Sequence, residues 1–296
     1  MTEVKTLFSS FVASSIPVLM YKEALPDQLV STEYRASHEI GSVQYHNPES
    51  SYFSMASRWG NNYYHWLFDI FATYLLAKEA GERVSSKIIL LGKWPGETQH
   101  VHEWLEFAGV SKINYVDSIP NDAAKVIFCE QYKNRIHPLV IKALLNFRPQ
   151  LEKRYERDCW PRYLLLQRGR LGTGASQSRN LENRGDIITY FAKRGIDLAV
   201  VYLEGTSVVQ QMFMFSHAEI VIAVHGAGLT NIVFCNSKCR IVEIASPIFY
   251  NPSYVDLASR MGLNFVSLLG SLSKENTDTN ASLIINPVLL WNVLFA

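Results

Sequence analysis

The fold of this chain follows from EIVIAVHGAGLTN, residues 219–231. Its first six residues, Glu219–Val224, are almost all apolar without alternation, which is typical of a strand buried on both faces of a parallel sheet. The tetrapeptide HGAG, residues 225–228, then predicts a tight turn into a helix that begins near Leu229. A buried strand that turns directly into a helix is the repeating unit of α/β folds.

The same alternation extends outward from this stretch, over residues 160–269. Short apolar runs predict strands at 162–167, 197–203, 219–224, 240–244 and 264–269. Apolar residues at helical spacing predict helices at 181–193, 207–217, 229–234 and 252–261. Five strands alternating with helices in about 110 residues predict a doubly wound α/β domain.

The first half of the chain is less regular, and it ends in a charged stretch. Patterns there predict helices at 62–80, 98–108 and 138–147 and strands at 87–92, 113–116 and 125–129. We place the domain boundary in QLEKRYERD, residues 150–158. We therefore expect an N-terminal domain over 1–155, a second domain over 156–270 and a tail over 271–296, whose apolar end packs against the first domain.

Composition excludes several classes of protein. The 296 residues include 28 Lys and Arg against 27 Asp and Glu, a net charge of +1, and 48% are hydrophobic. A disordered chain would be poorer in apolar residues, and a binder of nucleic-acid phosphates would carry a basic excess. Cys235 and Cys239 form at most half a zinc site, since Cys129 and Cys159 supply no matching pair; buried thiols are expected instead.

The sequence indicates a soluble protein. No apolar run reaches the roughly 18 residues that a spanning helix needs. The apolar stretch at 7–20 is interrupted by serines and Pro17, and it reads either as a weak signal peptide or as a strand near 16–19. A cytoplasmic location is our expectation.

The glycine turn is a candidate anion site. Glycines between a strand and a helix let the backbone approach an anion, and the first N–H groups of the helix point at it. His225, at the carboxyl end of its strand, lies where α/β proteins bind ligands. The alternative is a tight turn with a hydrogen-bonded histidine. Only GAG is present, so this is neither a GxGxxG motif nor a P-loop.

Basic side chains follow another strand of the same domain. Arg168 comes directly after the run RYLLLQ, so it is expected at the same sheet edge as His225, followed by Arg170, Arg179 and Asn183. The planar guanidinium group of arginine suits phosphate. The alternative is a set of solvated charges on a surface loop. Glu243, near the end of the strand RIVEI, either accepts hydrogen bonds from ribose hydroxyls or pairs with a basic neighbour.

A third candidate lies in NNYYHWLFD, residues 61–69. His65 and Asp69 are four apart on a predicted helix and share one face. Such a pair can act as a general base, in which either the carboxylate orients the imidazole or the carboxylate takes the proton itself. A buried polar pair with a purely structural role would have the same spacing.

Together these motifs resemble glycosyltransferase family 61. The resemblance rests on HWLFD, on LLLQR with the downstream RNLEN, on Gln210-Gln211, and on HGAGLTNIVF and VEI in that order, from about Tyr63 to Ile244. It implies an inverting enzyme of the GT-B architecture, with two Rossmann-like domains facing a cleft and a C-terminal helix returning to the first domain. It implies that the donor is a UDP-sugar, with xylose or N-acetylglucosamine as the sugar. It also implies that the acceptor is a glycan and that no metal ion is needed.

The resemblance also assigns roles to residues. Asp69 is the expected base, with His65 as its rival; Arg168 and Arg179 lie near the donor diphosphate, and Glu243 at the ribose. The full expected donor-binding set is Arg168, Arg170, Arg179, Asn183, Gln211, His225, Gly226, Ala227, Gly228, Leu229, Thr230, Asn231 and Glu243.

Other functions stay open at this point. An inactive or lectin-like relative would keep the glycine turn without needing Asp69. An α/β oxidoreductase or epimerase would need a nicotinamide fingerprint or an acid/base set in the second domain, and neither is present. The sequence also lacks the anchor of lumenal family members, which favours a bacterial or viral surface-glycan enzyme.

Overall fold

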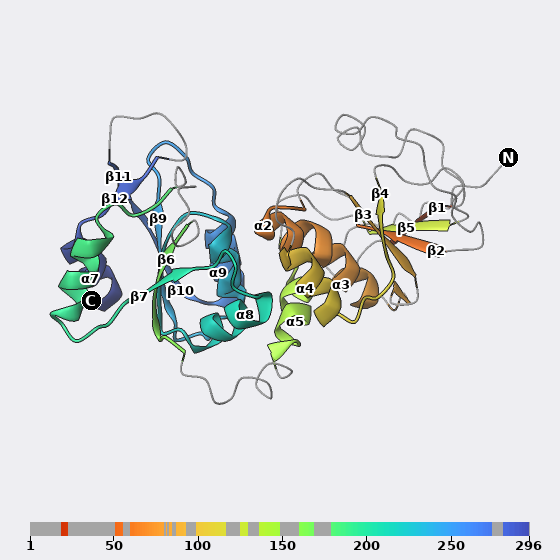
Figure 1. The fold of residues 1–296 in the computed structure, drawn as a ribbon, viewed down its shortest axis with the longest axis horizontal. Coiled ribbons are helices and arrows are strands. Elements are labelled where there is room, and N and C mark those ends of the chain that lie inside the picture. The colour runs from red at the N-terminus through yellow and green to blue at the C-terminus, as the bar shows by residue number, and fades with distance from the viewer. Residues whose placement is uncertain are drawn as a thin grey trace. The chain divides into compact units, whose positions relative to one another are not determined.

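The computed structural model describes residues 19–22, 51–55, 60–79, 81, 83–84, 87–92, 99–116, 125–129, 136–148, 160–168, 179–273 and 281–295. The chain divides into two compact units, residues 1–143 and 144–296, which we describe separately (Figure 1). The expected linker at 150–158, the turn-rich loop after Arg168 and Arg170 itself lie outside the described residues.

The first unit is built on a five-stranded sheet in the order β1-β5-β2-β3-β4. Its strands are β1 (Leu19–Lys22), β2 (Ser51–Ser54), β3 (Ile88–Gly92), β4 (Ile113–Val116) and β5 (Lys125–Cys129). All neighbouring strands are parallel except β1, which pairs antiparallel with β5. The strands predicted at β3, β4 and β5 are confirmed, whereas β2 was not predicted.

Helices of the first unit carry its aromatic core. They are α2 (Tyr63–His65), η1 (Trp66–Phe71), α3 (Ala72–Glu79), α4 (Gln99–Phe107) and α5 (Pro138–Leu145). The helix predicted at 62–80 is present, but its middle is the π-helical segment η1. The rings of Phe71 and Tyr74 stack at 5.8 Å, and Trp104 of α4 lies 5.3 Å from Phe71. Each buried ring of this size removes a large apolar area from water and so stabilises the unit.

The second unit contains a fully parallel sheet in the order β10-β9-β8-β6-β7. Its strands are β6 (Tyr163–Gln167), β7 (Ala199–Tyr202), β8 (Ile220–Val224), β9 (Arg240–Ala245) and β10 (Asn264–Leu269), which confirms all five predicted strands. All of β8 is buried, as its unbroken apolar run predicted. The chain leaves β6 for β7 on one side and continues through β8 on the other, so the strand order reverses between β6 and β8.

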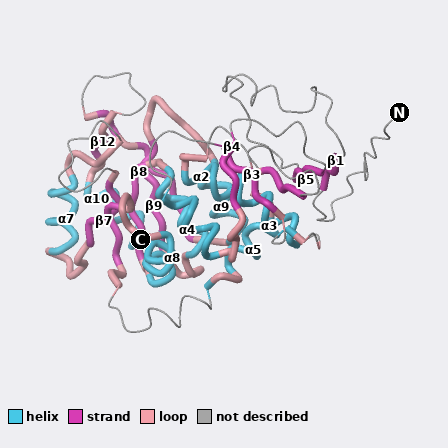
Figure 2. Tube along the Cα trace, turned by 45° about the vertical axis from the view of Figure 1, so that its right-hand side comes forward, coloured by secondary structure: helices cyan, strands magenta, loops and turns pink. Residues whose placement is uncertain are grey.

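Helices cover both faces of this sheet, as expected for a doubly wound fold (Figures 1 and 2). On one face lie α7 (Arg184–Ala192) and α10 (Pro287–Phe295), and on the other α8 (Val208–His217) and α9 (Ser253–Met261) with η3 (Ala227–Phe234). Ser207 caps α8 through a capping box with Gln210. The predicted helix at 229–234 starts two residues earlier and is a 3-10 helix, unusually long for that type.

The prediction that the tail packs against the first domain is wrong. After the short hairpin of β11 (Ser271–Leu272) and β12 (Leu283–Ile284), α10 packs against α7 and β9 of its own unit. Leu283, Leu290 and Leu294 are buried in the same cluster as Phe191. Apolar side chains of α10 are buried against α7 and β9, both of which belong to the second unit. The sequence pattern of the tail alone does not show which unit buries it. No described helix is both long enough and apolar enough to cross a bilayer.

Candidate anion-binding site

Arg168 and His225 follow adjacent parallel strands at the point where the strand order reverses. Arg168 comes after Gln167 at the end of β6, and His225 after Val224 at the end of β8. The Arg168 side chain lies against Gly226. A Cβ atom on Gly226 would be 3.6 Å from the Cδ, Nε and Cζ atoms of Arg168. Ligands of open α/β sheets bind outside the carboxyl ends of the strands at this switch point. The fold therefore brings the predicted arginine and the predicted histidine to one place.

Arg179 joins this cluster through an aromatic side chain that was not predicted. Its guanidinium carbon lies 5.1 Å from the ring of Phe249, and that ring lies 5.4 Å from the imidazole of His225. Burial, and then the positive charge of Arg168, lowers the pKa of Arg179. The two guanidinium groups repel each other, so binding of an anion beside them is favoured.

Several polar atoms of this cluster are buried without a hydrogen-bond partner among the described residues. They are Nη1 of Arg168 and Nε and Nη1 of Arg179. Buried donors in folded proteins are nearly always bonded, and leaving one unsatisfied costs about 1–3 kcal/mol. Three unsatisfied guanidinium donors at a switch point indicate a site for an oxygen-rich anion.

The segment 179–183 is fixed by two asparagine side chains. The Asn180 amide accepts from the backbone N–H of Arg168 at 2.8 Å and donates to its carbonyl at 3.2 Å. Asn183 makes the same pair of bonds with Ile285, at 3.3 and 2.9 Å. Asn180 thus positions Arg168, a role that its place in RNLEN did not single out, whereas Asn183, predicted to bind donor, anchors the C-terminal segment.

His225 is held by a buried carboxylate. Its Nδ1 lies 2.6 Å from Oε1 of Glu243, and the hydroxyl of Ser267 donates to Oε2 of Glu243 at 2.9 Å. Glu243 is 1% exposed and His225 7%. The ring of Tyr254 lies 5.1 Å from the imidazole and covers it from α9. These contacts fix the orientation of the ring.

The remaining residues of the predicted donor set shape the turn. Asn231 donates to Oε1 of Gln211 at 2.8 Å, and the Gln211 amide donates to the carbonyls of Leu203 and Thr206 at 3.2 and 2.8 Å. Leu229 and Asn231 are fully buried. The geometry therefore favours a supporting role for these side chains, while Gly226 lies next to the side chain of Arg168 and Gly228 next to that of Leu203.

The predicted acid–base pair lies in the first unit. His65 Nδ1 and Asp69 Oδ2 are 2.5 Å apart, and each side chain is about one third exposed (32% and 31%). Asp69 belongs to the π-helical segment η1, and such segments are frequent at functional sites. Asn62 caps the helix by accepting from the backbone N–H of Tyr64 at 3.0 Å. The predicted pair is therefore in direct contact and partly exposed to solvent.

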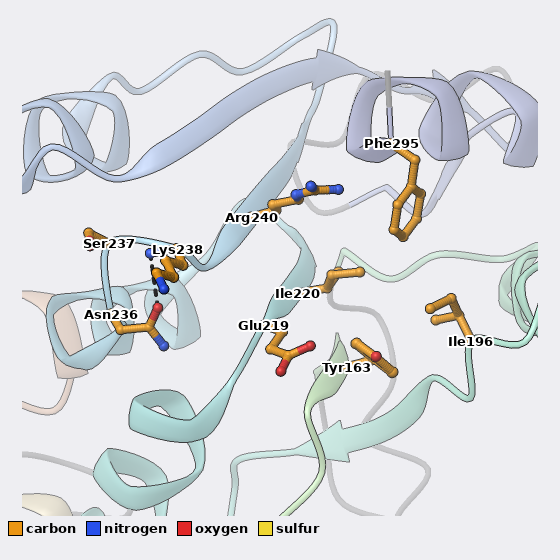
Figure 3. A pocket seen from close by; sticks show the side chains of 9 residues that line it. All are labelled: Tyr163, Ile196, Glu219, Ile220, Asn236, Ser237, Lys238, Arg240 and Phe295. Atoms are coloured by element: carbon orange, nitrogen blue, oxygen red, sulfur yellow. Dashed lines mark hydrogen bonds between the residues drawn. The ribbon is translucent and has the colours of Figure 1, made fainter.

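A hollow of about 660 Å³ opens at the other edge of the second sheet, where its strands begin (Figure 3). Glu219 in its lining pairs with Arg162, and Arg240 donates to the carbonyl of Leu294 at 2.5 Å. None of the predicted site residues lines it. Cys235 and Cys239 are buried free thiols, and among the described residues no group of three or more His, Cys, Asp or Glu could hold a metal ion.

Comparison with known families gives a match. The model of the family described as Glycosyltransferase 61 matches residues 63–242. The match includes the His65–Asp69 pair, Arg168, Arg179 and the glycine turn, and it ends one residue before Glu243. No curated protein matches the chain significantly.

Proposed function

This chain belongs to glycosyltransferase family 61, and we propose that it transfers a sugar from a UDP-linked donor to a hydroxyl group of a glycan acceptor, with inversion and without a metal. The observation that carries the proposal is the paired arginine site, in which Arg168 and Arg179 hold buried guanidinium donors without partners among the described residues. Xylose and N-acetylglucosamine are the sugars that we propose first.

The arginine site suits the leaving group of this reaction. A nucleoside diphosphate gains negative charge as the bond to the sugar breaks, and donors fixed in advance around it stabilise that charge most effectively. Arg168, Arg179, His225 and the backbone of the glycine turn supply cationic and N–H donors at one place. Because these groups carry the charge, we propose that no divalent ion is needed.

The His65–Asp69 pair suits the acceptor. In an inverting transfer the acceptor oxygen forms a bond to the anomeric carbon while the bond from that carbon to the diphosphate breaks. The diphosphate leaves with the electron pair, and a base takes the acceptor proton. We propose Asp69 as that base, oriented by His65, with His65 as the alternative. The two units would then act as acceptor and donor domains of a GT-B enzyme.

A binding protein without catalysis is the second candidate. It would use the same anion site without needing an exposed Asp69, and the exposure of about one third of the Asp69 and His65 side chains favours the enzyme.

A nucleotide panel tests the proposal. We expect UDP and GDP to raise the melting temperature of the full chain more than CMP does, because the arginines bind a terminal diphosphate, and we expect NAD, whose diphosphate is esterified at both ends, to raise it least. Arg168→Gln should lose the UDP effect. Stabilisation by NAD alone would overturn the proposal. Hydrolysis of UDP-xylose and UDP-N-acetylglucosamine in EDTA then tests the metal: activity lost in EDTA and restored by Mn²⁺ would contradict metal independence.

A further inference from the structure

We propose that Glu243 is a positioning residue that acts through His225 and does not touch the donor. Glu243 holds the proton on Nδ1 of His225, so that Nε2 is the nitrogen presented to the donor diphosphate, and Ser267 holds Glu243. The role in donor binding rests on the proposed function; the arrangement of the three side chains does not.

Burial separates Glu243 from any ligand. The residue is 1% exposed, and both carboxylate oxygens already have partners on neighbouring strands. His225 follows β8, Glu243 lies within β9, and Ser267 lies opposite Glu243 on β10. A ribose hydroxyl would have to displace the imidazole or the serine to reach the carboxylate. Glu243, the carboxylate expected at the ribose, is thus buried against the imidazole of His225.

The surroundings determine where the proton lies. An ionised carboxylate only accepts hydrogen bonds, so the hydroxyl of Ser267 donates to one oxygen and Nδ1–H of His225 to the other. With Nδ1 protonated, Nε2 is the free nitrogen, and a second proton there makes it a cationic donor to phosphate. The hydrogen bond of one ring nitrogen sets the function of the other.

The spectrum of His225 tests the arrangement without any donor. Protein labelled with ¹⁵N at histidine is recorded by long-range ¹H–¹⁵N correlation, and the His225 signals are assigned as those missing from His225→Gln. We expect Nδ1 of His225 to be protonated in the native chain. In Glu243→Gln the side-chain amide can donate to Nδ1, and the proton should move to Nε2. A native histidine that is neutral and protonated only at Nε2 would overturn the proposal.

Binding of two nucleotides distinguishes positioning from ribose contact. Glu243→Gln should weaken binding of UDP and of 2′,3′-dideoxy-UDP by the same factor, roughly tenfold or more, by analogy with partners that orient a ligating histidine. If Glu243 bound the ribose hydroxyls, the loss would vanish with the dideoxy nucleotide, and the proposal would fail. Ser267→Ala removes only the outer bond and should cost about fivefold for both nucleotides.

The two readouts separate this inference from the proposed function. A chain that shows the expected His225 spectrum but binds no nucleotide refutes the transferase and keeps the positioning of His225. If Glu243→Gln fails to fold, the spectrum of the native chain and the binding by Ser267→Ala still test the proposal, because both keep the Glu243 carboxylate. An equal loss of both nucleotides in Ser267→Ala supports the proposal, and no loss of either contradicts it.

Discussion

Arg179 combines a stability cost with a binding role, and the two can be measured separately. In Arg179→Met the apolar stem is kept, while a half-buried cation beside Arg168 is removed. We expect the melting temperature without ligand to stay equal or rise, and the rise with UDP to be lost. A ligand at one hundred times its Kd stabilises by about 2.7 kcal/mol, so the lost shift is readily measured. Differential scanning fluorimetry with and without UDP gives both values.

The control for Arg179 is Arg260→Met on α9. Arg260 is partly exposed and pairs with Asp256 one turn away at 2.9 Å, so its loss should change the free energy of unfolding by no more than about 0.5 kcal/mol. UDP should stabilise this variant as it does the native chain. A full UDP shift in Arg179→Met would remove Arg179 from the site.

His100 predicts a pH dependence of the first unit. Burial lowers the pKa of His100, whose Nε2 lies 3.2 Å from the carbonyl of Gly60. Below the unfolded value of about 6.5 the unfolded chain therefore binds more protons at this residue than the folded chain does. Stability falls as the pH drops through that value, until the folded pKa is also passed; above pH 6.5 there is no such effect.

The change His100→Phe keeps an aromatic ring beside Tyr63 and Trp66 and removes the titration. Urea unfolding of the full chain at pH 7.5 and pH 5.0 measures the difference between variant and native protein. We expect the variant to be less stable at pH 7.5, where the bond to Gly60 is lost, and to gain relative to the native chain at pH 5.0. A difference in the free energy of unfolding between variant and native chain that is the same at both pH values would contradict the pH dependence assigned to His100.

At the scale of elements, the segment 179–183 offers a matched pair of variants. Asn180→Ala and Asn183→Ala each remove two hydrogen bonds to backbone, from Arg168 and from Ile285 respectively. Each should destabilise the chain by about 1–3 kcal/mol. Only Asn180→Ala should also weaken UDP binding, because it releases the backbone that carries Arg168. Isothermal titration with UDP at a temperature where both variants are folded checks this. Equal binding losses would show that Asn183 acts at the donor, as its motif first suggested.

The sequence predicted elements well where a local pattern determined them. The strands of the second unit, including buried β8, and the arginine and histidine that follow β6 and β8 needed only hydrophobic runs and the rule that carboxyl ends of parallel strands meet. The partners of these residues depend on cross-strand register instead: Ser267 faces Glu243 because β10 pairs with β9, and no local signal marks it. The π-helical form of η1 and the position at which α10 packs likewise depend on contacts between segments that are distant in sequence.

At the scale of the whole molecule, the proposal assigns the acceptor proton to the first unit and the donor to the second. Variants of each unit should therefore fail differently. Asp69→Asn should lower kcat by about 10²- to 10⁴-fold, the usual contribution of a general base, and leave the UDP shift unchanged. Arg168→Gln should lose the UDP shift and lower kcat/KM, because it removes contacts to the leaving diphosphate. The two variants are compared by steady-state kinetics on a glycan acceptor, and their UDP-induced shifts in melting temperature are measured in parallel.

His65→Gln decides between the two possible bases. If Asp69 takes the proton, His65 only orients the carboxylate across 2.5 Å, and its replacement by a hydrogen-bonding amide should cost far less than Asp69→Asn. If His65 is the base, the order reverses. Full activity in Asp69→Asn excludes Asp69 as the base. A lost UDP shift in Asp69→Asn contradicts the division of roles between the two units, because a residue that acts only on the acceptor should not affect UDP binding when no acceptor is present.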